Sequence, residues 1–94
     1  MSTIATPVGR YEFHAAVPDD IESERLRQIR KWGHQSHDPV YWVGILAEEL
    51  GEVAQCAIEH RSRRELYEEV TQLAAVAVAM MEDLAARDLV DPDE

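Results

Sequence analysis

Two long stretches of this chain carry apolar residues at intervals of three and four, and this periodicity limits the possible folds more than any other feature. The first stripe, within about residues 39–60, consists of Val43, Leu46, Leu50, Val53 and Ala57. The second, which ends near Arg87, consists of Leu66, Val70, Leu73, Ala77, Met80 and Leu84. Such spacing is typical of amphipathic helices that bury one face. The sequence therefore predicts two long helices whose stripes form a shared core.

Capping residues indicate where these two helices begin. Asp38 is placed to cap the first helix, with Pro39 at its first helical position. Ser62, followed three residues later by Glu65, has the spacing of a capping box and opens the second helix. Because only a short turn separates them, the two helices are predicted to form a hairpin.

A shorter helix is predicted to precede the hairpin. It begins at Asp19 or Asp20, where an aspartate is a favourable cap, and ends at Gly33. Residues 1–18 show no helical period and are predicted to be an arm. Residues 19–88 then form one helical domain, and residues 89–94 form an acidic tail that frays. The predicted fold class is therefore all-α, a helical hairpin with one preceding helix.

Size and charge narrow the class of protein. The 94 residues include 19 acidic and 9 basic side chains, which gives a formal net charge of −10. An acidic chain lacks the basic surface that nucleic acids require, so no nucleic-acid partner is predicted. A domain of this size buries only about two-thirds of the surface that its unfolded chain exposes, so a partner subunit would help to stabilise it.

The sequence also indicates the cellular compartment in which the protein works. The single cysteine, Cys56, has no partner for an internal disulfide, which fits a reducing cytoplasm. The first ten residues lack the apolar core of a signal peptide, and the longest apolar run, residues 73–81, is too short to span a bilayer. A cytoplasmic protein without a membrane partner is predicted.

An internal repeat relates the two long helices. Residues 47–58 read AEELGEVAQCAI, and residues 67–78, twenty positions later, read YEEVTQLAAVAV. The alignment pairs Glu48 with Glu68, Glu49 with Glu69, and Glu52 with Gln72. At about 100° per residue, Glu48 and Glu68 point almost opposite to the stripes, whereas the other two pairs lie along one edge of them.

This repeat predicts a metal site. If the helices pack antiparallel, Glu49, Glu52 and Glu69 converge beside the core, with Gln72 as their neighbour. Carboxylates gathered in this way repel one another and are partly desolvated, unless a cation neutralises them. Oxygen ligands suit hard cations such as Mg²⁺. A di-iron site is disfavoured because no glutamate has a histidine three residues later.

The chain resembles the MazG-like family of all-α nucleoside triphosphate pyrophosphohydrolases. The similar segments, within about residues 22–86, are RQIRKWGHQSHD, ILAEELGEVAQ and ELYEEVTQLAAVAVAM. The resemblance implies a Mg²⁺-dependent enzyme that cleaves a nucleoside triphosphate (NTP or dNTP) to the monophosphate and pyrophosphate. It also implies a homodimer or homotetramer in which subunits combine into a four-helix bundle.

The family's metal motif, E-x-x-E followed by E-x-x-D, falls on Glu49, Glu52 and Glu69, with Gln72 where an aspartate is usual. A glutamine oxygen ligates without charge, so this departure bears on metal affinity and on activity. Glu48 and Glu49 are the predicted catalytic residues. Glu48 is the candidate either for the base that accepts the proton of the attacking water or for a role outside the direct ligands of the metal, although its helix angle turns it away from the stripe.

The resemblance places the substrate beside residues 31–37. Lys31 is expected either to reach a phosphate or to be a solvated residue at a helix end. Trp32 is expected either to stack on a base or to pack against the protein. Gln35 and His37 are expected to make polar contacts with the nucleotide.

Two other classes of protein compete with this hypothesis. A degenerate, non-catalytic helical module that binds a nucleotide or a protein partner is consistent with Gln72. A purely structural dimerisation domain is also consistent with the hairpin, but it would leave the cluster of Glu49, Glu52 and Glu69 without a purpose.

Overall fold

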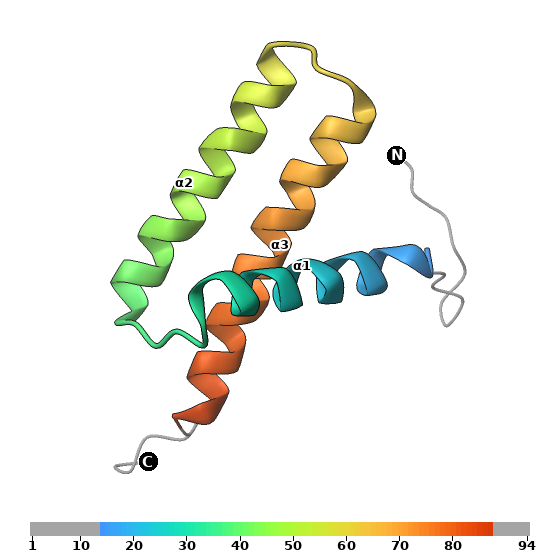
Figure 1. The fold of residues 1–94 in the computed structure, drawn as a ribbon. Coiled ribbons are helices and arrows are strands. Elements are labelled where there is room, and N and C mark those ends of the chain that lie inside the picture. The colour runs from blue at the N-terminus through green and yellow to red at the C-terminus, as the bar shows by residue number, and fades with distance from the viewer. Residues whose placement is uncertain (1–13, 88–94) are drawn as a thin grey trace, which may run out of the picture.

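The computed structural model describes residues 14–87, which form three helices and no strand. They are α1 (Ala16–Trp32), α2 (Pro39–Ile58) and α3 (Arg63–Ala86). α2 and α3 run antiparallel as a hairpin, and α1 crosses α3 at a steep angle (Figure 1). Both α1 and α2 pack against α3, whereas the backbones of α1 and α2 do not approach each other. The predicted all-α class is confirmed for the described residues.

Both predicted caps of the hairpin are present. The Asp38 side chain accepts a hydrogen bond from the Val40 N–H at 2.9 Å, and Pro39 opens α2. Ser62 Oγ accepts from the Glu65 N–H, and the Glu65 carboxylate accepts from the Ser62 N–H, each at 3.1 Å. These reciprocal bonds satisfy two backbone donors that the first turn of a helix leaves free.

We expect Ser62→Ala to destabilise the folded chain by about 1 kcal/mol, because it removes the acceptor of this capping box. Chemical denaturation followed by circular dichroism measures the change in the free energy of unfolding. Ser23→Ala is the matched control, since Ser23 is exposed within α1 and caps nothing. Equal stabilities of the two variants would contradict the importance of the cap.

The predicted start of the first helix was wrong. α1 begins at Ala16, three residues before Asp19, and has no side-chain cap. Pro18 therefore lies in the first turn, where a helix tolerates proline because the N–H there has no intrahelical partner. The last part of the predicted arm is thus helical. Residues 1–13 of the arm and the predicted tail, residues 89–94, lie outside the described residues.

On α2, the face that packs is turned by about one residue from the predicted stripe, whereas most of the predicted α3 stripe is half-buried. Three stripe residues, Val43, Leu50 and Val70, are 55%, 56% and 44% exposed. The preceding residues Trp42, Glu49 and Glu69 are buried or half-buried in their place. One residue corresponds to a rotation of about 100° around the helix axis. The centre of the α2 stripe therefore lies beside the contact with α3. The predicted α3 stripe, apart from Val70, is half-buried.

The core of the described chain is small. Its buried apolar residues are Trp42, Cys56, Ala75 and Val76. Large apolar side chains elsewhere are exposed, among them Val40 at 79% and Ile58 at 74%. No helix within residues 14–87 has the length and apolar character needed to cross a bilayer.

Candidate functional site

Glu49 lies at the centre of the face by which α2 packs. Its Oε1 atom is buried and has no hydrogen-bond partner in the structure. Desolvation raises the pKa of Glu49, and the nearby negative charges of other glutamates raise it further. In order of effect, these are Glu52, Glu69, Glu24 and Glu48. We refer to these four residues and Glu49 as the acidic cluster. A buried carboxylate in such surroundings is unstable as an anion unless a cation or a proton neutralises it.

Glu24 is the member of the acidic cluster that sequence reasoning missed. It lies on α1 and accepts two hydrogen bonds from Arg27, at 2.9 and 2.7 Å. The bond from Arg27 is the main cause that lowers the pKa of Glu24. The pKa of Arg27 is raised chiefly by Glu24, and the charge of Glu49 contributes. Since α1 lies outside the twenty-residue repeat, only the crossing of α1 over α3 brings Glu24 to the cluster.

A cavity of about 610 Å³ extends from the acidic cluster along α3, between α1 and α2. Near the middle of the helices it is lined by Glu24, Glu48, Glu49 and Gln72. Toward the loop that joins α1 to α2 it is lined by Trp32, Gln35, Tyr41 and Trp42. We refer to these as the carboxylate end and the aromatic end, and the charged residues Arg25, Arg27, Glu82 and Asp83 also line the cavity. A cavity with charged and aromatic walls matches a ligand with a charged part and a flat apolar part.

Five of the predicted site residues line the cavity: Glu48, Glu49, Gln72, Trp32 and Gln35. Glu48 was predicted to lie almost opposite the apolar stripe. It is exposed on α2 and is nevertheless among the residues that line the cavity.

Four other predicted residues, Lys31, His37, Glu52 and Glu69, are not among those that line the cavity. Glu52 and Glu69 lie close enough to raise the pKa of Glu49. His37 contacts the cavity residue Gln35, and its Nε2 atom lies 2.7 Å from the Gln35 Oε1 atom. The Nζ atom of Lys31 lies 4.7 Å from the ring centre of Trp32, which is a cation–π contact.

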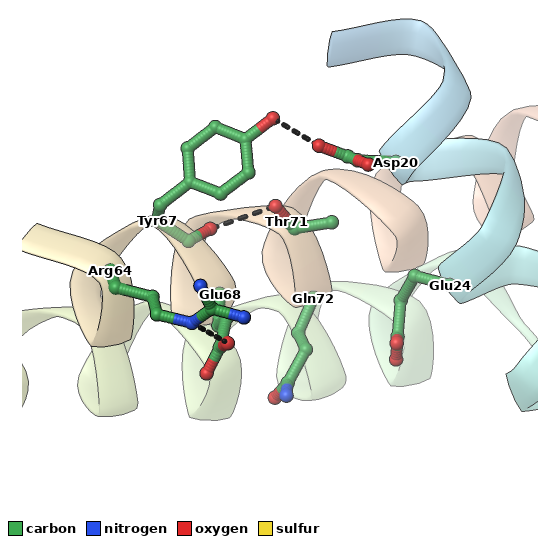
Figure 2. Close-up of a pocket in the computed structure, with 7 residues that line it drawn as sticks. All are labelled: Asp20, Glu24, Arg64, Tyr67, Glu68, Thr71 and Gln72. Carbon is green, nitrogen blue, oxygen red and sulfur yellow. Dashed lines mark hydrogen bonds and ion pairs between the residues drawn. The ribbon is translucent and has the colours of Figure 1, made fainter. Parts of the chain in front are cut away.

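A smaller cavity of about 460 Å³ adjoins the first (Figure 2). The Tyr67 hydroxyl donates to Asp20 at 2.7 Å, and this bond raises the pKa of Tyr67. Glu24 and Gln72 line both cavities, and Figure 2 shows their side chains extending toward the same side from α1 and α3. Gln72 thus lies where the two cavities meet, beside a carboxylate that the family motif does not include.

Asp83, the buried charged residue of α3, was also missed from the sequence. It is 8% exposed and accepts a hydrogen bond from the indole N–H of Trp42 at 2.8 Å. This bond, with a second from the His37 N–H, holds the pKa of Asp83 far below its usual range. Its sequence signal is weak, because a single aspartate near a helix end usually faces solvent.

The acidic cluster offers carboxylate oxygens, which are the ligands that a hard divalent cation prefers. In residues 14–87, no three His, Cys, Asp or Glu side chains are arranged closely enough to hold a metal ion. Repulsion between their negative charges favours separation of the carboxylates of the acidic cluster. The buried, unpartnered Oε1 atom of Glu49 is the feature that fits a cation.

Comparison with family models, curated proteins and solved structures gives no match for this chain. The acidic cluster and the cavity are therefore the features that point to a function. The MazG-like resemblance stays a prediction.

Proposed function

We propose that this chain is a Mg²⁺-dependent nucleoside triphosphate pyrophosphohydrolase that works in the cytoplasm. The buried Oε1 atom of Glu49, which has no partner and is acted on by the negative charges of four other glutamates, is the observation that carries the proposal. Such an atom favours binding of a cation, and a cation is also what an acidic protein needs in order to accept a polyphosphate. The resemblance of the sequence to the MazG-like family supports the same reaction.

The residues of the site have separate tasks in this proposal. Glu49, Glu52, Glu69 and the Gln72 amide oxygen would hold Mg²⁺. The ion would neutralise charge on the phosphates and favour attack by water between the α- and β-phosphates. Glu48 lines the cavity without a hydrogen-bond partner among the described residues, so its carboxylate is available to accept the proton of that water. The aromatic end, where Trp32 and Tyr41 are exposed, would receive the base.

We also propose that two hairpins associate into a four-helix bundle, as a dimer or a tetramer. In such a bundle the stripe of each helix faces the centre, midway between its two neighbours. With a single neighbour present, that stripe would be half exposed, which is the observed state of Val43, Leu50 and Val70. The exposed side of α2 is apolar along its length, through Val40, Ala47 and Ile58. A helix that is apolar on both sides is normally buried between partners.

The proposed activity is tested by pyrophosphate release from a panel of NTPs and dNTPs with and without Mg²⁺. We expect turnover of at least one nucleotide that disappears when Mg²⁺ is chelated. A chain that binds nucleotide without releasing pyrophosphate would favour the non-catalytic module. A chain that binds neither nucleotide nor Mg²⁺ would favour a structural dimerisation domain.

We expect Gln72→Asp to lower the Mg²⁺ concentration for half-maximal activity by about tenfold, because it adds a negative charge beside the ion. Pyrophosphate release as a function of Mg²⁺ measures the effect. Thr71→Asp is the control, since it adds the same charge to α3 one residue away, in the wall of the smaller cavity only. If both variants shift the Mg²⁺ dependence equally, only the general field has changed and Gln72 is not a ligand. Activity that appears only in Gln72→Asp would support the non-catalytic module for the natural chain.

A further inference from the structure

Asp83 is buried and charged, and it lies in the wall of the larger cavity but outside the acidic cluster. The proposed chemistry gives it no task. Its Oδ2 atom accepts hydrogen bonds from the Trp42 indole (2.8 Å), the His37 backbone N–H (3.0 Å) and the Arg87 Nη2 atom (3.0 Å). Its Oδ1 atom accepts another from Arg87 Nε at 3.2 Å. These donors belong to α2, to the loop between α1 and α2, and to the end of α3. Asp83 therefore ties three parts of the fold together.

Arg87 adds further bonds to the same loop. Its Nη2 atom donates to the backbone carbonyl of His37 at 2.8 Å and to the Ser36 hydroxyl. The N–H of His37 is thus held by Asp83 of α3, and its C=O is held by Arg87, directly after α3. The His37 ring packs against the rings of Tyr41 and Trp42, with centroids 4.5 and 4.9 Å apart. We refer to Asp83 and Arg87 together as the clasp.

The position of the loop matters because the backbones of α1 and α2 do not approach each other. Residues 33–38 are the covalent link between them, and the clasp holds that link against α3. The loop and the two helix ends beside it supply the aromatic end of the cavity, with Trp32, Gln35 and Tyr41. Gln72 lies eleven residues before Asp83 on α3, which is roughly 16 Å along a helix. The clasp is thus remote from the carboxylate end.

We propose that Asp83 and Arg87 are positioning residues, which hold the loop in the shape that accepts the base and sugar of the nucleotide. This inference rests on the proposed function and extends it. The clasp sets the affinity for the nucleotide and has no direct part in Mg²⁺ binding or in the attack of water. Removing it enlarges the range of loop conformations, so binding must then order the loop again.

The test uses the full chain with Asp83→Asn and Arg87→Gln, and with Asp19→Asn as the matched control. Asp19 is exposed in the first turn of α1, and its replacement changes the charge as Asp83→Asn does. Hydrogen exchange at the His37 amide reports on the loop directly. Initial rates of pyrophosphate release, as functions of nucleotide and of Mg²⁺, separate KM, kcat and the Mg²⁺ requirement.

For both clasp variants we expect exchange at His37 to accelerate and KM for the nucleotide to rise, each by about tenfold, the effect of losing one hydrogen bond to a charged group. We expect kcat at saturating nucleotide and the Mg²⁺ dependence to stay within about twofold of the natural chain, because the carboxylate end is untouched. Asp19→Asn should change none of these quantities. Arg87→Lys should restore less than half of the loss, because an ammonium does not reproduce the planar set of donors.

If Asp83→Asn fails to fold, Arg87→Gln decides the question, because the Arg87 side chain is 44% exposed. Unchanged exchange at His37 in the folded variants would overturn the clasp whatever the nucleotide data show. Faster exchange with an unchanged KM would overturn its role in nucleotide affinity. A natural chain that turns over no nucleotide, while the variants still accelerate exchange at His37, would refute the proposed function and confine the clasp to holding the loop.

Discussion

Replacing Glu49 with glutamine is expected to reduce Mg²⁺-dependent pyrophosphate release by at least about 100-fold, because it removes the central anionic ligand of the proposed site. Glutamine has nearly the same shape as glutamate, so the packing of α2 on α3 should survive. Assays with saturating nucleotide and increasing Mg²⁺ measure the loss. An active Glu49→Gln variant with an unchanged Mg²⁺ requirement would show that the metal site has been misplaced.

The same variant should melt at a higher temperature than the natural chain when Mg²⁺ is chelated. Burial and neighbouring carboxylates raise the pKa of Glu49, so the folded state disfavours its charged form. Stability associated with the protonated form is complete below the unfolded pKa of about 4.3 and is lost as the pH rises through the higher folded value. The gain in melting temperature for Glu49→Gln should therefore be largest near neutral pH and should shrink toward pH 4.

Glu22→Gln is the control for both measurements. Glu22 is exposed on α1 and carries the same charge, but it is not part of the acidic cluster. We expect its activity and melting temperature to match those of the natural chain. If Glu22→Gln stabilises the chain as much as Glu49→Gln does, relief of the overall negative charge is the cause and not the burial of Glu49.

Replacing Leu50 with glutamate is expected to dissociate the proposed oligomer into monomers. Leu50 is 56% exposed in the single chain, so the monomer has room for the new side chain. At the centre of a four-helix bundle, the same charge would be buried without a partner, and a symmetric interface would carry it at least twice. Glutamate is a good helix former, so α2 itself should persist. We expect the dissociation constant to rise by at least about 100-fold, as measured by sedimentation.

Gln55→Glu is the matched control for the oligomer. Gln55 lies on the polar side of α2, where its amide bonds Glu59. The substitution introduces the same side chain into the same helix, with only a small repulsion one turn away. The control should remain associated. A natural chain that sediments as a monomer at micromolar concentration would contradict the proposed bundle, and Leu50→Glu would then change nothing.

The ends of the hairpin helices were predictable because local chemistry determines them. Asp38 with Pro39, and Ser62 with Glu65, satisfy free backbone donors within one turn, whatever the rest of the chain does. The start of α1 was not predictable in this way. It begins at Ala16 without a side-chain cap, so the capping preference of Asp19 had no influence on it.

The faces of the helices show the limit of periodicity. A stripe of apolar residues says that a helix is buried on that side, but not by which neighbour. Trp42 donates its indole N–H to Asp83, and Ala75, which is fully buried, lies in the same small core. The packed face of α2 is thus turned away from the centre of its stripe, which leaves Val43 and Leu50 exposed.

The sequence by itself determined the all-α class, two of the three helix starts and the presence of carboxylates beside the core. Each depends on residues a few positions apart, and within a helix the sequence spacing determines which side chains share a face. The tertiary structure alone decided that Glu24 joins the acidic cluster, that Glu48 faces the cavity and that Asp83 with Arg87 holds the loop. These depend on how α1 and α2 are placed on α3, and that placement results from side-chain packing between residues far apart in the chain.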